Sequence, residues 1–295
     1  MDTQILSGKV VSESVYKGLK SRIVKLKTNS ITPCLAVVLI GDDAPSHVYV
    51  KNKTKKFASL NLNSETIKLT NETSENALLE IINNLNNDNK YHGILVQLPL
   101  PNHINNETII NAIDPKKDVD GFNPVNLGRL AAGRPSFIPC TPKGIMRVFE
   151  YYKIDLSNKH VVVVGRSNIV GRPISILTSL KRKYSNATTT ICHSGTKNIS
   201  YFTKQADIVI LALGSPEYLK GNDIKEGAVV IDVGINRVKS QTKTGYKLLG
   251  DCEFSSINGK ASCISPVPGG IGPMTIAMLV ENTIEAAEKS ANFAL

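Results

Sequence analysis

Apolar runs and amphipathic stretches alternate along this 295-residue chain. Short runs without charge, rich in Val, Ile and Leu, predict strands buried on both faces, and apolar residues at helical spacing predict helices between them. Strands are predicted at residues 35–40, 66–69, 93–98, 160–164, 188–192, 207–212 and 228–233. Helices are predicted at residues 9–27, 44–59, 74–86, 105–112 and 275–289, with one more from Pro142. Asp43 is the candidate N-cap of the helix at 44–59, and Pro45 falls in its first turn. This alternation predicts an α/β fold with a parallel sheet.

The chain is expected to form two lobes. Residues 123–142 are rich in Gly and Pro and have little periodicity, so we predict that they connect the lobes. Thr141 and Pro142 have the residue types of an N-cap and a first helical residue. Residues 236–250 predict a hairpin, and the Gly- and Pro-rich residues 265–275 predict a loop before the last helix.

Composition narrows the class of protein. The chain is 41% hydrophobic and 20% charged, as in ordinary globular proteins. No apolar run reaches the length of a membrane span, so we expect no membrane partner. The first residues lack the features of a secretory signal, and the five cysteines are scattered singly, with no CxxC pair. An odd number of isolated thiols predicts a reducing compartment and a cytoplasmic protein.

The formal net charge of +10 raises the question of a polyanionic partner. The basic residues are spread along the chain, Trp is absent, and no cluster of arginines and aromatic residues occurs. We therefore expect a small anionic ligand rather than nucleic acid. The histidines and cysteines show no metal-ligand spacing, so no metal site is predicted.

The strongest local motif is the buried run at residues 161–164, which stops at Gly165 and is followed by Gly171. A turn of this kind exposes backbone N–H groups at a helix start, where phosphate groups bind favourably. The middle glycine of the usual dinucleotide fingerprint is missing. Alone, the motif fits an ordinary strand–helix connection as well, with Arg166 as a solvated loop residue.

The charges around this motif indicate which dinucleotide binds. No Asp or Glu occurs between Asp155 and Asp207, whereas Lys and Arg are frequent there. An NAD site places a carboxylate about 20 residues after its first glycine, to bind the ribose 2′-hydroxyl. Here residues 192–194, at the end of the next predicted strand, are Cys, His and Ser and offer no carboxylate. An acid-free, cationic site suits a 2′-phosphate, so we predict NADP, with Arg166 and Ser194 beside the phosphate.

The first lobe contains separate candidates for catalysis. Tyr49 and Lys53 are four residues apart and share a face of the predicted helix. By spacing alone, packing of an amphipathic helix with a solvated ammonium is the better interpretation. Gln97 ends a buried strand, where α/β enzymes place their sites, but a loop-capping amide fits equally well. Asp120 is either a turn former or a ligand-binding carboxylate.

Six motifs occur together and in order. They are Tyr49-x-x-x-Lys53, Val96-Gln97-Leu98-Pro99-Leu100-Pro101, Lys117-Asp118-Val119-Asp120-Gly121, Pro139-Cys140-Thr141-Pro142, Gly165-Arg166-Ser167-x-x-Val170-Gly171 and Pro266-Val267-Pro268-Gly269-Gly270-x-Gly272-Pro273-Met274-Thr275. In this set the chain closely resembles the bifunctional methylenetetrahydrofolate dehydrogenase/methenyltetrahydrofolate cyclohydrolases. The likeness runs from about Leu6 to the C-terminal helix.

The resemblance implies a folate-binding catalytic domain of residues 1–140 with the C-terminal helix 273–295, and a Rossmann-type NADP-binding domain of residues 141–272. It implies a homodimer. It also implies NADP-dependent oxidation of 5,10-methylenetetrahydrofolate, followed by hydrolysis of the methenyl product to 10-formyltetrahydrofolate.

The resemblance further assigns roles to residues. Lys53 is the central catalytic residue, held by Gln97, while Tyr49 stacks on the folate and Asp120 anchors its pterin ring. The other residues expected at the substrate are Val96, Leu98, Pro268, Gly269, Gly270, Ile271 and Gly272. Those expected at the cofactor are Gly165, Arg166, Ser167, Ser194 and Ile235.

Two other hypotheses remain open. An NADP-linked dehydrogenase for another small substrate would use the same second lobe and give Lys53 no hydrolytic role. A non-catalytic basic binding protein would leave Tyr49, Lys53, Gln97 and Asp120 without a reason to occur together.

Overall fold

The computed structural model describes residues 2–242 and 245–291. The chain divides into two compact units. The six-stranded unit comprises Met1–Val15 and Thr141–Ala277, and the three-stranded unit comprises Tyr16–Cys140 and Met278–Leu295. Two long helices, α1 (Gly8–Thr28) and α10 (Ile271–Ser290), contribute residues to both units.

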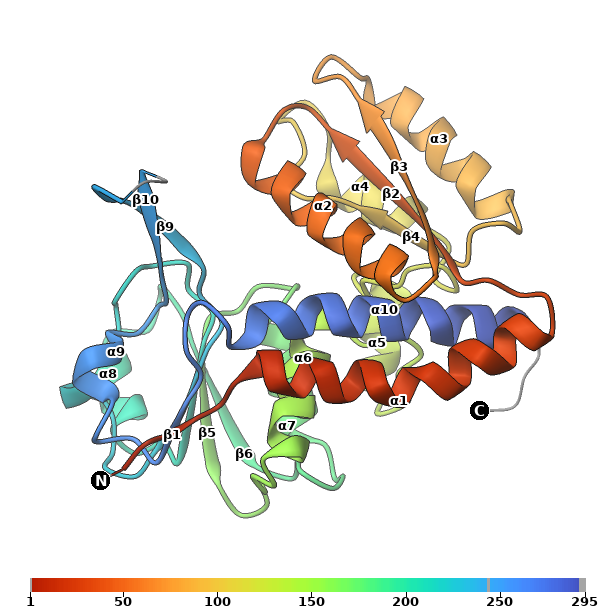
Figure 1. Cartoon of the computed structure of the whole chain (residues 1–295). Coiled ribbons are helices and arrows are strands. Elements are labelled where there is room, and N and C mark those ends of the chain that lie inside the picture. The colour runs from red at the N-terminus through yellow and green to blue at the C-terminus, as the bar shows by residue number, and fades with distance from the viewer. Residues whose placement is uncertain (1, 243–244, 292–295) are drawn as a thin grey trace. The chain divides into compact units, whose positions relative to one another are not determined.

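The three-stranded unit has a parallel sheet in the order β3-β2-β4 (Figure 1). Its strands are β2 (Cys34–Ile40), β3 (Asn63–Leu69) and β4 (Gly93–Val96), and its helices are α2 (Ala44–Ser59), α3 (Glu75–Asn87), α4 (Asn106–Ala112) and α5 (Pro124–Ala131). Apolar residues of α3 and α4 form one core cluster with those of β2 and β4. Helix α2 packs against β2 and β3, which places its buried side chains beside the sheet.

Local sequence explains where helix α2 begins. Asp43 is its N-cap, and the Oδ2 atom accepts hydrogen bonds from the backbone N–H and the hydroxyl of Ser46. Pro45 lies in the first turn, where its missing N–H costs no hydrogen bond. The predicted cap is therefore confirmed, and it fixes the start of the helix that carries Tyr49 and Lys53.

The six-stranded unit has an all-parallel sheet in the order β1-β11-β8-β7-β5-β6 (Figure 1). Its strands are β1 (Gln4–Ile5), β11 (Cys263–Ile264), β8 (Val229–Asp232), β7 (Ile208–Leu211), β5 (His160–Val164) and β6 (Thr188–Cys192). Its shorter helices are α6 (Cys140–Tyr151), α7 (Gly171–Ser179), α8 (Ile199–Thr203), α9 (Phe254–Ile257) and the 3-10 turn η1 (Gly221–Asp223). The hairpin of β9 (Asn236–Lys239) and β10 (Tyr246–Leu249) projects from this unit.

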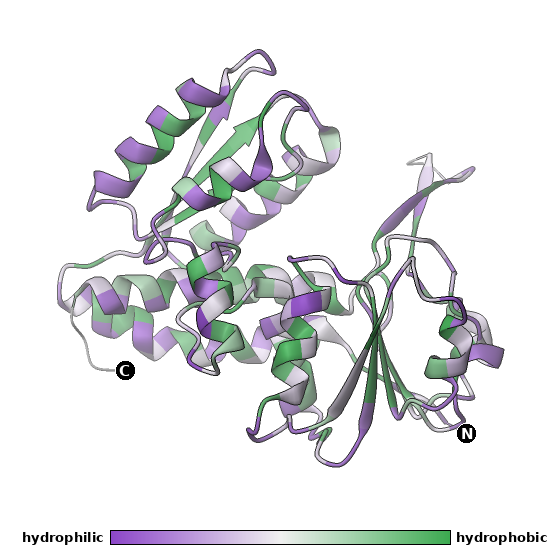
Figure 2. Cartoon of the chain, turned by 180° about the vertical axis from the view of Figure 1, so that it is seen from behind, coloured by the Kyte–Doolittle hydropathy of each residue, from purple (hydrophilic) through white to green (hydrophobic). Residues whose placement is uncertain are grey.

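The central strands of both sheets are strongly hydrophobic and are green in Figure 2. In the six-stranded unit, apolar residues of α8 and α9 form one core cluster with those of the central strands. Helix α7 packs against β5 and β6. Because all six strands run in the same direction, their carboxyl ends lie along one edge of the sheet. This edge is called the carboxyl edge below.

The predicted α/β fold with a parallel sheet is confirmed. Three local predictions were wrong. Residues 123–142 contain α5, whose N-cap Asn123 accepts a hydrogen bond from the backbone N–H of Val125. Helix α6 begins at Cys140, so Thr141 lies inside it, and the Thr141 hydroxyl is hydrogen-bonded to that of Thr275. Helix α10 begins at Ile271, within the segment predicted as a loop.

The two-residue strands β1 and β11 were not predicted, because two residues carry no detectable periodicity. Strand β1 adds the beginning of the chain to the sheet of the second half. Residues 1–15 accordingly belong to the six-stranded unit, although the division expected from the resemblance put them in the catalytic domain. The functional assignment of the two domains remains a prediction.

Candidate catalytic and cofactor sites

Lys53 and Gln97 meet in the three-stranded unit although they are far apart in sequence. Lys53 lies on α2 and is only 4% exposed, and its Nζ donates a hydrogen bond of 3.1 Å to Gln97 Oε1. The other end of the Gln97 amide donates to the backbone oxygen of Leu98 at 2.7 Å. Because this second bond orients the amide, its oxygen faces the ammonium.

Tyr49 completes this cluster one helical turn before Lys53. The Lys53 Nζ lies 4.7 Å from the centre of the Tyr49 ring, which is a cation–π contact. The shared helix face predicted from the spacing is therefore present. The interpretation from spacing alone, a solvated ammonium on an amphipathic helix, was wrong. The Lys53 amine is buried between an aromatic ring and an amide oxygen.

Burial changes the protonation of this cluster. Removal from water lowers the pKa of Lys53 below its ordinary value, and the Asp120 carboxylate and Cys140 oppose this effect. Burial likewise raises the pKa of Asp120, while the Lys53 charge opposes it. Each group therefore favours the charged form of the other, and the uncharged amine of Lys53 is more accessible near neutral pH than that of an exposed lysine.

The loop that carries Asp120 is held by a second carboxylate, that of Asp118. Asp118 is buried, and its oxygens accept hydrogen bonds of 2.8–3.2 Å from the backbone N–H groups of residues 121–123 and from Asn126 Nδ2. Gly121 has φ of 75°, and a Cβ atom there would lie 2.7 Å from the backbone nitrogen of Pro139. Sequence reasoning missed the role of Asp118. The Asp-x-Asp-Gly spacing was its available signal.

Val96 and Leu98 lie on either side of Gln97, at the carboxyl end of β4. Both contribute to a narrow crevice that Asp120 and Phe122 also line. The three-stranded unit therefore brings together six predicted site residues: Tyr49, Lys53, Val96, Gln97, Leu98 and Asp120.

The predicted cofactor turn lies at the carboxyl edge of the six-stranded unit. Gly165 has φ of 131°, and a Cβ atom there would lie 2.3 Å from the backbone oxygen of Ala212. A Cβ atom at Gly171 would lie 2.2 Å from the backbone oxygen of Gly165. Only glycine fits either position, so the chain turns tightly from β5 into α7 and leaves room for a close ligand.

Ser167 lies in the loop between β5 and α7. Its Oγ accepts hydrogen bonds from the backbone N–H groups of Val170 at 3.1 Å and Gly171 at 3.4 Å. The hydroxyl hydrogen has no acceptor among the described residues and is available to a ligand oxygen. The site therefore offers an oriented donor beside the positive end of a helix.

Arg166 and Ser194 follow two paired strands at the carboxyl edge. Val164 of β5 pairs with Cys192 of β6, and each predicted residue follows its strand by two positions. Both are exposed, as a ligand contact requires. Ile235 follows β8 at the same edge and is 54% exposed. Two exposed donors, obligate glycines and the absence of Asp and Glu from residues 156–206 fit a 2′-phosphorylated dinucleotide.

The remaining predicted substrate residues, 268–272, belong to the six-stranded unit. They connect β11 to the first residues of α10. A Cβ atom at Gly270 would lie 2.5 Å from the backbone oxygen of Pro266, and its N–H donates to the same oxygen at 2.8 Å. The conformation of this segment is therefore set by close backbone contacts, as its Gly- and Pro-rich sequence predicted. Its contact with the folate remains a prediction.

Other classes of site are not apparent. Residues 2–242 and 245–291 contain no group of three His, Cys, Asp or Glu side chains that could hold a metal ion. Within the same residues, no helix combines the length and hydrophobicity that a membrane crossing needs. All five cysteines are free and buried.

Comparison with known proteins gives a family match for both parts of the chain. Residues 6–120 match the family model for the catalytic domain of tetrahydrofolate dehydrogenase/cyclohydrolase, and residues 139–291 match the model for its NAD(P)-binding domain. The chain is 50% identical over 291 residues to the bifunctional protein FolD of Acetivibrio thermocellus, covering 99% of each chain.

Solved structures give the same result. The bifunctional FolD methylenetetrahydrofolate dehydrogenase/cyclohydrolase of Campylobacter jejuni superposes with a TM-score of 0.92 at 45% identity, covering 98% of this chain and 99% of the other. The Trypanosoma brucei enzyme, solved with NADP and an inhibitor, gives a TM-score of 0.93 at 33% identity and covers 99% of each chain. The chain belongs to the tetrahydrofolate dehydrogenase/cyclohydrolase family.

Proposed function

We propose that this protein oxidises 5,10-methylenetetrahydrofolate to 5,10-methenyltetrahydrofolate with NADP⁺ and hydrolyses the product to 10-formyltetrahydrofolate. The observation that carries the proposal is the buried Lys53 amine, held by Gln97 and Tyr49 in a chain of this family. A dehydrogenase without hydrolytic activity would have no need for such an amine.

Tyr49 and Asp120 are assigned to substrate binding. The ring of Tyr49 offers a flat, partly exposed face on which the planar part of a folate can stack. Asp120 offers a carboxylate that accepts hydrogen bonds from the N–H groups of the pterin ring. The rigid loop around Asp118 holds this carboxylate in place, so the substrate is oriented before it reacts.

Lys53 is assigned to the hydrolytic step. A water oxygen forms a bond to the cationic methenyl carbon, and a neutral Lys53 amine accepts a proton from that water. The new hydroxyl then loses its proton and becomes the formyl oxygen as the ring C–N bond breaks. The leaving ring nitrogen gains the proton that Lys53 took from the water, so that one proton is released in the net reaction. Burial, which lowers the pKa of Lys53, favours the neutral amine, and the Gln97 oxygen orients the amine toward one direction.

The NADP site supplies the hydride acceptor. NADP⁺, when bound there, would supply the hydride acceptor for the methylene bridge, a redox chemistry that protein side chains lack. Gly165 and Ser167 would hold its phosphates, and Ile235 would contact the cofactor through its exposed aliphatic side chain. Arg166 and Ser194 would bind the 2′-phosphate, because a guanidinium offers two parallel donors to a phosphate.

Several finer points are part of the proposal. The catalytic domain would comprise residues 1–140 with 273–295, the NADP-binding domain would comprise residues 141–272, and residues 268–272 would form part of the folate site. The active form would be a homodimer, which light scattering measures directly. Five free, buried thiols support a reducing, cytoplasmic location.

The test is an assay of the purified protein with 5,10-methylenetetrahydrofolate and either NADP⁺ or NAD⁺. Absorbance follows the reduced nicotinamide and the methenyl product separately. We expect turnover with NADP⁺ and less efficient turnover with NAD⁺. Absence of turnover with both cofactors would reject the proposed oxidation.

A further inference from the structure

The structure points to a role for a buried carboxylate that none of the predicted sites contains. We infer that Asp251 is a positioning residue of the dehydrogenase reaction, which fixes the backbone of two neighbouring loops at the carboxyl edge so that they can receive the nicotinamide cofactor. This inference rests on the proposed NADP-dependent function.

The first loop follows β7. Asp251 is 0% exposed, and its two oxygens accept hydrogen bonds of 2.7–3.0 Å from the consecutive backbone N–H groups of residues 213–215. The preceding residue, Ala212, has the backbone oxygen that a Cβ atom at Gly165 would meet at 2.3 Å. The loop held by Asp251 therefore begins beside the predicted cofactor turn.

The second loop follows β8. Asn236 Nδ2 donates a hydrogen bond of 2.9 Å to Asp251 Oδ1, which then has two donors, as does Oδ2. A Cβ atom at Gly234 would lie 2.3 Å from the same Oδ1. The exposed side chain of Ile235 is assigned to the cofactor. Its two neighbours fix its backbone, because Gly234 packs against Asp251 and Asn236 is hydrogen-bonded to Asp251.

A second buried carboxylate connects Asp251 to the sheet. Asp232, the last residue of β8, is 1% exposed, and its Oδ1 accepts hydrogen bonds of 2.9 Å from the backbone N–H groups of Asp251 and Gly234. The backbone N–H of Asp232 donates to Ser265 Oγ at 2.7 Å. The loops after β7 and β8 are consequently joined through two carboxylates, and Ser265, which follows β11, is bonded to the backbone of Asp232.

The substitution Asp251→Asn tests the inference with little change in volume. An asparagine has one acceptor oxygen, and its NH₂ group faces donors, so one pair of N–H groups loses its acceptor. We expect the Kd for NADPH, measured by fluorescence titration, and the KM for NADP⁺ to rise roughly tenfold or more. The reason is that each lost hydrogen bond had fixed the backbone of a loop at the cofactor. Hydrolysis of supplied methenyltetrahydrofolate should keep its kcat and KM.

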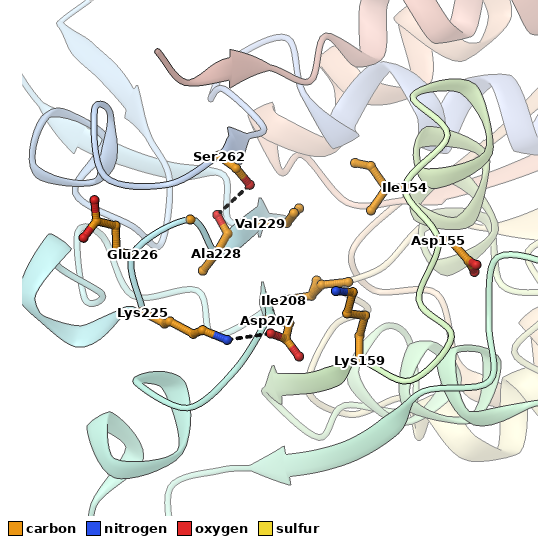
Figure 3. Close-up of a pocket in the computed structure, with 11 residues that line it drawn as sticks. Ile154, Asp155, Lys159, Asp207, Ile208, Lys225, Glu226, Ala228, Val229 and Ser262 are labelled. Atoms are coloured by element: carbon orange, nitrogen blue, oxygen red, sulfur yellow. Dashed lines mark hydrogen bonds and ion pairs between the residues drawn. The ribbon is translucent and has the colours of Figure 1, made fainter. Parts of the chain in front are cut away.

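Two further variants separate positioning from general loss of structure. Asn236→Ala removes one donor and leaves the carboxylate, so we expect a smaller rise in the NADPH Kd; it also serves if Asp251→Asn does not fold. Asp207→Asn is the matched control. Asp207 also binds a backbone N–H, that of His160, and pairs with Lys225, but it precedes β7 at the opposite edge of the sheet (Figure 3). We expect it to lower stability without changing the NADPH Kd.

The outcomes are distinguishable. An unchanged NADPH Kd in Asp251→Asn and Asn236→Ala, or an equal loss of dehydrogenase and hydrolase activity with no change in either KM, would overturn the positioning role. A wild-type protein that binds NADPH but does not oxidise methylenetetrahydrofolate would contradict the proposed function instead. The titrations would then still decide the inference about Asp251.

Discussion

The hydrogen bond between Lys53 and Gln97 predicts that two substitutions of Gln97, to Leu and to Glu, shift the pKa of Lys53 in opposite directions. The Lys53 ammonium donates to Gln97 Oε1 at 3.1 Å in a site where it is 4% exposed. A hydrogen bond from a charged donor stabilises that charged form by about 1.5–3 kcal/mol. Gln97→Leu removes the acceptor, so the acid dissociation constant of the ammonium should increase roughly 10- to 150-fold.

The sign follows from which form is active. The neutral amine accepts the proton from water, and burial already lowers the pKa of Lys53. Gln97→Leu lowers it further, so the rising part of the pH profile of hydrolysis should move to lower pH. Gln97→Glu places a carboxylate opposite the ammonium, raises the pKa of Lys53 and should move the profile to higher pH.

The assay is the pH dependence of kcat/KM for methenyltetrahydrofolate, corrected for hydrolysis without enzyme, because this ratio reports the groups of the free enzyme. Gln205→Leu is the control. Its amide donates only to the backbone oxygen of Tyr201 among the described residues, so the profile should stay unchanged. The same midpoint in the wild type, Gln97→Leu and Gln97→Glu would refute the reasoning, whatever the absolute rates.

Three further predictions follow from the geometry. Arg166→Ala should raise the KM for NADP⁺ much more than that for NAD⁺, whereas Arg172→Ala, on the next turn, should change neither; equal effects on both cofactors would remove the 2′-phosphate contact. Gly171→Ala should lower the free energy of unfolding by more than about 1–3 kcal/mol in urea titrations, because its Cβ would lie 2.2 Å from a backbone oxygen, while Gly18→Ala, with open space around it in α1, should raise it by about 0.5–1 kcal/mol. Lys53→Met should be more stable than the wild type at neutral pH. The difference in the free energy of unfolding should shrink as pH rises from the lowered pKa of Lys53 toward its ordinary value of 10.5, since in that range the unfolded wild type binds a proton that the folded one does not. A pH-independent difference would contradict a buried ammonium.

Sequence patterning located most of the fold because the buried strands β2, β4, β5 and β7 are runs of apolar residues. Strands β5 and β6 begin and end where they were predicted, and α2 begins after its predicted cap, Asp43. The short strands β1 and β11 escaped notice because each exists only through pairing with a distant segment. Helix α5 was hidden among Gly and Pro residues, although Asn123-Pro124 is a recognisable helix start.

The site was predicted less completely, for a physical reason. The spacing of Tyr49 and Lys53 indicated a shared helix face, but whether the amine is buried depends on Gln97, which lies 44 residues further along the chain. Asp118 and Asp251 both bind backbone N–H groups. The Asp-x-Asp-Gly spacing was a weak signal for Asp118, and no side-chain pattern marks Asp251. The resemblance to a family supplied roles for individual residues, and the structure supplied the contacts between them.

The central claim is that one chain oxidises methylenetetrahydrofolate and then hydrolyses the product through the buried amine of Lys53. The most direct measurement compares the wild type with Lys53→Met, each supplied with methenyltetrahydrofolate alone, by following the loss of its absorbance. The account predicts rapid formation of 10-formyltetrahydrofolate by the wild type and only the rate without enzyme in the variant, with NADPH binding unchanged. Equal hydrolysis by the two proteins would contradict it.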